Sequence, residues 1–151
     1  KLFFNKYLIM RFLKNKLFLI LILFIITSCR KEEVDGIKIG GTGLYNSSSF
    51  EENKKLCNLI TGTIKKDNKS LSGLLNFNCG GASGCYDLGY IITQIIYKTG
   101  ESDFLEIAKK LSQNDKNELN GFIQVGLEYY YEDKVYKTEF KDLYQFLNPK
   151  S

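Results

Sequence analysis

The 151-residue sequence has no histidine and no tryptophan, one proline (Pro149) and one methionine (Met10). Without histidine, the chain cannot by itself form a Ser-His-Asp triad, a Cys-His dyad or a histidine-ligated zinc site. We therefore expect a protein that binds rather than catalyses and that holds no metal or cofactor. A hydrolase that depends on cysteine or carboxylate groups is the remaining enzymatic alternative.

The formal net charge of +4 is unevenly distributed along the chain. Five of the 21 lysines and arginines precede Cys29, whereas all 17 acidic residues follow it, so the later segment has 16 basic residues against 17 acidic ones. Nucleic-acid binding normally requires a clustered basic face. We therefore expect no nucleic-acid partner.

The longest apolar run is the ten-residue segment Leu17–Ile26. A membrane-spanning helix needs about 20 apolar residues, whereas the core of a signal peptide needs about 7–15 behind a positively charged segment. Arg11, Lys14 and Lys16 supply that charge if translation starts at Met10. The pattern predicts a signal peptide over residues 1–28. The alternative is an uncleaved anchor helix, which each of these charges would oppose by about 2.5–3.5 kcal/mol near the bilayer centre.

The four residues Ile-Thr-Ser-Cys29 end this segment, and they resemble the lipobox of bacterial lipoproteins. The resemblance implies that Cys29 is acylated, becomes the first residue of the mature protein and anchors it in the outer membrane; several acyl chains make such anchorage durable. Lys31, Glu32 and Glu33 resemble the surface-export tag of Bacteroidota-type lipoproteins. This second resemblance implies display at the cell surface, with a periplasm-facing position as the alternative.

The remaining sequence predicts a small helical domain over residues 48–151, behind a lipidated cysteine and flexible tether over 29–47. Four glycines and little apolar periodicity favour the tether, although Ile37 and Ile39 are compatible with a short strand. In the domain, apolar residues recur at helical spacing in several segments. These segments are 50–66, 71–75, 85–98, the stretch capped by Ser102, the stretch after the Asp115/Glu118 capping box, and 140–147 capped by Thr138.

Five or six short helices with one apolar face each predict an all-α compact bundle. One segment is ambiguous, because Ile123, Val125, Leu127 and Tyr129 also alternate as in a strand. An α+β fold with a C-terminal hairpin near 122–137 is therefore the alternative. The capping box upstream favours the helix.

Three cysteines remain after Cys29, and an exported protein permits disulfides. Cys79 and Cys85 flank a glycine-rich loop, so we expect a bridge that joins Cys79 to Cys85 or to Cys57. A catalytic hypothesis places a reactive Cys85 thiol at a helix N-terminus, where the helix dipole lowers its pKa. A structural role is favoured, because the chain has no histidine to act as the base.

Tyr129, Tyr130 and Tyr131 form the one cluster that suggests a binding surface. A helix cannot bury three consecutive side chains on one face, so at least one ring must be exposed, and tyrosine is enriched at binding surfaces. We therefore expect an outer-membrane lipoprotein that binds a protein partner without catalysis. Two alternatives stay open: an immunity protein that neutralises an antibacterial toxin, and an envelope assembly or structural lipoprotein.

Overall fold

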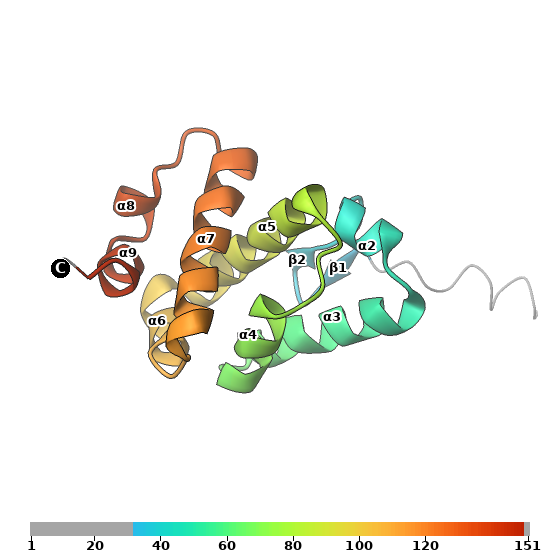
Figure 1. Ribbon diagram of the computed structural model, residues 1–151, viewed down its shortest axis with the longest axis horizontal. Helices are drawn as coiled ribbons and strands as arrows, with labels where there is room; N and C mark the ends of the chain where they lie inside the picture. The colour runs from blue at the N-terminus through green and yellow to red at the C-terminus, as the bar shows by residue number, and fades with distance from the viewer. Residues whose placement is uncertain (1–31, 150–151) are drawn as a thin grey trace, which may run out of the picture. The chain divides into compact units, whose positions relative to one another are not determined.

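The computed structural model describes residues 32–149, over which a pair of short strands is followed by eight helices (Figure 1). The all-α prediction is confirmed, with a minimal antiparallel sheet added. The predicted signal peptide over 1–28, the predicted lipidation site Cys29 and Lys31 of the predicted export tag lie outside the described residues. The elements are β1 (Glu33–Val34), β2 (Ile37–Lys38), α2 (Gly43–Ser47), α3 (Phe50–Ile64), α4 (Asn68–Leu75), α5 (Ala82–Thr99), α6 (Glu101–Ala108), α7 (Gln113–Tyr130), α8 (Tyr136–Glu139) and α9 (Lys141–Leu147).

The predicted tether over 29–47 is wrong from Glu32 onward, because this segment folds against the helices. Asp35 and Gly36 both have positive φ and turn the chain between β1 and β2, which is the geometry of a tight hairpin turn. Glycines in this segment, such as Gly36 and Gly41 with positive φ, thus allow tight turns and do not mark a flexible tether. The apolar residues of this segment are buried, namely Val34, Ile37, Ile39, Leu44 and Tyr45.

Helix α5 lies at the centre of the fold, where it contacts α2, α3, α6 and α7 (Figure 1). Its apolar face is fully buried and consists of Leu88, Ile91, Ile92, Ile95 and Ile96. Helix α7 crosses α5 where two glycines meet. A Cβ on Gly89 would lie 2.6 Å from the Phe122 carbonyl oxygen, and a Cβ on Gly126 would collide with the Gly89 carbonyl oxygen. The two backbones are therefore in direct contact.

The alternative hairpin near 122–137 does not form, because α7 continues without interruption to Tyr130. Three predicted caps are also wrong. Ser112 caps α7 in place of Asp115, Gly100 precedes α6 in place of Ser102, and Thr138 lies inside α8. The capping box of Ser49 and Glu52 on α3 is confirmed. None of the helices within residues 32–149 is long and apolar enough to cross a membrane.

Candidate functional site

The outer face of α5 carries three tyrosines, Tyr86, Tyr90 and Tyr97, at spacings of four and seven residues. These spacings bring the three side chains to one side of an α-helix. The end of α7 lies over this side and contributes Tyr129, Tyr130 and Tyr131. We call the six residues together the tyrosine surface.

The rings of the tyrosine surface pack as a ladder. Tyr86 stacks on Tyr129 with 4.3 Å between ring centroids, and Tyr90 stacks on Tyr130 at 4.2 Å. Tyr131 then lies 5.2 Å from Tyr97, so the ring contacts continue along α5. Offset aromatic pairs at such distances contribute about 0.5–1.5 kcal/mol each beyond the area they bury. The ladder thus holds each ring in a fixed orientation.

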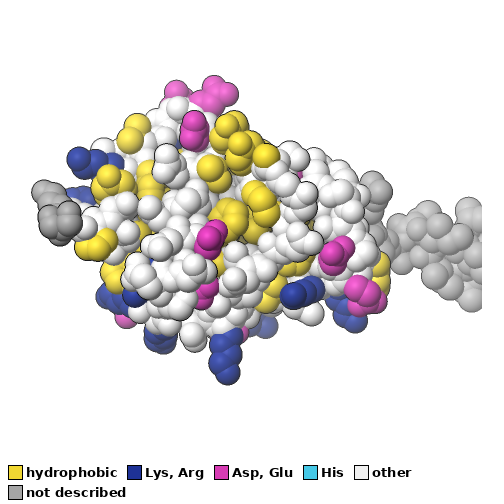
Figure 2. All heavy atoms as spheres, in the orientation of Figure 1, with side chains coloured by type: hydrophobic (Ala, Val, Ile, Leu, Met, Phe, Trp, Pro, Cys, Tyr) yellow, Lys and Arg dark blue, Asp and Glu magenta, His cyan; other side chains and the backbone are white. Residues whose placement is uncertain are grey.

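The ladder leaves much of its aromatic area open to solvent. Tyr129 is 52% exposed, Tyr130 41% and Tyr97 39%, whereas Tyr131 is half-buried. Helix α7 ends at Tyr130, and the non-helical backbone of Tyr131 turns this third ring toward Tyr97. Figure 2 shows the resulting concentration of apolar and aromatic side chains over α5 and the C-terminal half of α7.

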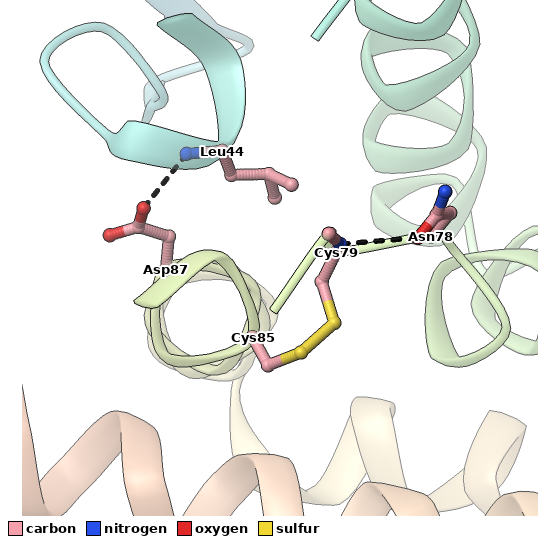
Figure 3. Close-up of a disulfide and its surroundings, with 6 residues drawn as sticks. Leu44, Asn78, Cys79, Cys85 and Asp87 are labelled. Carbon is pink, nitrogen blue, oxygen red and sulfur yellow. Dashed lines mark hydrogen bonds between the residues drawn. A yellow bond between two sulfur atoms is a disulfide. The ribbon is translucent and has the colours of Figure 1, made fainter. Parts of the chain in front are cut away.

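A buried carboxylate supports the ladder from below. Asp87, which is 6% exposed, accepts a hydrogen bond from the Leu44 backbone N–H at 2.9 Å and another from the Tyr130 hydroxyl. Figure 3 shows Asp87 reaching from α5 to the first turn of α2. Burial, together with the hydrogen bond to Asp87, raises the pKa of Tyr130 to about 12. Asp87 therefore connects three helices at this surface.

A second carboxylate fixes the other end of the ladder. The Tyr97 hydroxyl donates to Glu139 at 2.8 Å, and Glu139 also pairs with Lys134 at 3.1 Å. The hydrogen bond from Tyr97 is the main cause that lowers the pKa of Glu139. Burial and the same hydrogen bond raise the pKa of Tyr97. Glu139 thus attaches α8 to α5 beside the tyrosine surface, and its salt bridge joins Lys134 in the loop after α7 to the same point.

Cys79 forms a disulfide with Cys85, one of the two pairings expected from the sequence. The bridge closes the glycine loop and attaches it to the first turn of α5, one residue before Tyr86 (Figure 3). The loop contains Gly80 and Gly81, both with positive φ. In this state Cys85 has no thiolate and cannot act as a nucleophile, and Cys57 does not belong to the bridge.

A shallow groove of about 200 Å³ lies between α5 and α7 beside the stacked Tyr86 and Tyr129 rings. Its floor is apolar, and one carboxylate lies at its edge. The lining residues are Cys85, Tyr86, Asn117, Glu118, Gly121, Phe122 and Val125. The groove therefore extends the tyrosine surface along α7.

A wider groove of about 800 Å³ lies along α8 and α9 and includes Lys137 and Lys141 among its lining residues. Within residues 32–149, neither lysine forms a salt bridge across this groove. In the described segment of the chain, no group of three or more acidic or cysteine side chains is placed to hold a metal ion. Among these features, the tyrosine surface is the one whose side chains are held in place by ring stacking and by hydrogen bonds to buried or half-buried carboxylates.

The sequence directed attention to only half of this site. The tyrosines of α5 were missed, although their i, i+4, i+11 spacing on the polar side of a helix was visible. No sequence pattern marks Asp87 as a residue of the site, because its role depends on the packing of α2 against α5. Of the residues predicted as an export tag, Glu32 and Glu33 are exposed. Comparison with protein-family models, curated proteins and solved structures gives no match for this chain.

Proposed function

We propose that the protein is an outer-membrane lipoprotein, anchored through Cys29, whose folded domain binds a protein partner through the tyrosine surface. The signal-peptide pattern and the lipobox resemblance support the anchor. The observation that carries the binding role is the pair of stacked tyrosine couples, Tyr86 with Tyr129 and Tyr90 with Tyr130.

The physical properties of the tyrosine surface suit protein recognition. Tyrosine offers a large contact area and a polar hydroxyl, and interface hot spots are enriched in it. Stacking, Asp87 and Glu139 already restrict the rings, so binding costs little additional side-chain entropy. A preorganised, partly exposed aromatic surface is therefore favourable for an interface.

The site chemistry favours binding over catalysis. The chain contains no histidine, and the one cysteine at a helix N-terminus is held in a disulfide. Asp87 is already engaged by two donors. The groove beside Tyr86 is shallow, whereas small-molecule sites usually enclose about 300–1,000 Å³.

Photo-crosslinking tests the binding role directly. A benzophenone amino acid replaces Tyr129 in the full chain, expressed in the native cell, and the matched control carries it at Phe50. Phe50 is 65% exposed on α3, outside the tyrosine surface. We expect a discrete adduct with one protein from position 129 and none from position 50. No adduct from position 129, or the same adducts from both positions, would contradict the proposal.

A further inference from the structure

Carboxylates lie around the end of α7 that carries the tyrosine surface. Glu128 precedes Tyr129 in the chain, Glu132 and Asp133 follow Tyr131, and all three acidic residues are at least partly exposed. Glu118 lies at the edge of the adjoining groove. Asp87 and Glu139 each accept a hydrogen bond from a tyrosine hydroxyl of this surface, Asp87 from Tyr130 and Glu139 from Tyr97. The surface is therefore both aromatic and acidic.

Carboxylates outnumber lysines around this surface. Lys134 pairs with Glu139 at 3.1 Å, and Lys134 and Lys137 line a groove together with Glu128 and Glu132. Lys98 is exposed beside Tyr97. Asp87 forms no salt bridge with any lysine in residues 32–149. Both arginines of the chain, Arg11 and Arg30, precede the described residues, so the folded domain has no guanidinium of its own. The negative charge beside the tyrosines is thus only partly compensated.

We propose that the tyrosine surface binds an arginine-bearing basic segment of its protein partner. This inference rests on the proposed function and adds the chemistry of the partner. A guanidinium stacks on an exposed tyrosine ring through a cation–π contact, and its planar donors pair with neighbouring carboxylates. A lysine can supply the charge but not the planar stacking.

Short synthetic peptides test this inference on the purified full chain in neutral detergent micelles. The probes alternate glycine with arginine, lysine or glutamate, and binding is followed through the NMR signals of ¹³C-labelled tyrosine rings. We expect saturable shifts of the tyrosine-surface signals with the arginine peptide, weaker binding of the lysine peptide, and no shift with the glutamate peptide. Tyr129→Ala should weaken arginine-peptide binding about fivefold, and Phe50→Ala should leave it unchanged.

Charge variants test whether binding depends on the carboxylates beside the tyrosine surface or only on the net charge of the protein. Glu128→Gln combined with Glu132→Gln should reduce arginine-peptide affinity several-fold at low salt. Glu33→Gln combined with Glu51→Gln, which removes the same charge elsewhere, should not. Equal effects of both pairs, or equal binding of the arginine and glutamate peptides, would overturn the inference.

The crosslinking experiment keeps this inference separate from the proposed function. Mass spectrometry of the adduct from position 129 identifies the segment of the partner that meets the tyrosine surface. An acidic or uncharged segment would overturn the inference while the binding role stands. Absence of any adduct would overturn the binding role itself.

Discussion

Individual residues decide how closely the two long helices approach. Gly89 and Gly126 lie where α5 and α7 cross, and a methyl group on either would meet backbone atoms of the other helix. Backbone atoms cannot move aside as the end of a flexible side chain can. The same contact brings the end of α7 over α5, which is a condition for stacking the tyrosines.

Gly126→Ala should therefore destabilise the protein. Overpacking costs about 1–3 kcal/mol and outweighs the gain of up to about 1 kcal/mol in helix propensity. Gly121→Ala, on the same helix, is the matched control, because a Cβ there has nothing within 4 Å. We expect the control to be neutral or slightly stabilising in urea unfolding. Equal stability of the two variants would contradict the close crossing.

The ionisation of the Tyr130 hydroxyl is a measure of its hydrogen bond to Asp87. Burial and Asp87 raise the pKa of Tyr130 to about 12, whereas an unfolded tyrosine ionises near 10. The stabilising contribution is therefore fully present below pH about 10, and it is lost as the pH rises through about 12.

Ultraviolet titration of tyrosinate in the folded protein should show a transition near pH 12 that disappears in Tyr130→Phe. Tyr144→Phe is the control, since Tyr144 lies on α9, which contributes no hydrogen bond to Asp87, and the substitution should leave that transition in place. If Tyr130→Phe did not change the high-pH end of the titration, the predicted link to Asp87 would be wrong.

At the scale of elements, the disulfide fixes where α5 begins. It joins Cys79 to Cys85 across a separation of six residues and immediately precedes Tyr86. Short closed loops remove less unfolded-state entropy than long ones, so we expect the bridge to contribute about 2 kcal/mol.

Cys79→Ser combined with Cys85→Ser should lower the free energy of unfolding by about 2 kcal/mol under non-reducing conditions. It should also increase hydrogen exchange in the first turn of α5, while exchange in α9 remains unchanged. Cys57→Ser is the control for thiol loss outside the bridge. Similar exchange at both helices in the double variant would argue against a local effect of the disulfide.

Element boundaries were predicted unevenly from the sequence. The capping box of Ser49 and Glu52 was correct because both partners lie within one helical turn. Asp115 was mistaken for a cap. It lies in the first turn of α7, where it accepts hydrogen bonds from Ser72 and Asn76, two side chains of a different segment. Burial raises the pKa of Asp115, but these two hydrogen bonds and a third from Ser112 outweigh the effect of burial. The pKa of Asp115 is therefore lowered overall.

At the scale of the whole molecule, the predicted anchor at Cys29 and the folded domain are closer in sequence than the predicted tether implies. Three residues separate Cys29 from β1, which starts at Glu33 and belongs to the fold. The proposed lipoprotein therefore has a short connection to its acyl chains rather than the long segment predicted for 29–47.

Cys29→Ser should abolish acylation of the chain. Cells fed a clickable palmitate analogue should label the wild-type protein and not this variant, and the variant should leave the membrane fraction. Cys57→Ser is the control and should remain labelled. Equal absence of label from wild type and Cys29→Ser would refute the lipid anchor.

The sequence by itself determined the helical class, most helix positions and the need for at least one exposed ring among Tyr129, Tyr130 and Tyr131, because apolar periodicity and helix geometry act over a few residues. Tertiary structure alone decided that residues 32–47 fold. It also selected Cys85 as the partner of Cys79, and it brought the tyrosines of α5 under the end of α7. These outcomes depend on packing between segments that are distant in the chain, which local sequence patterns do not encode.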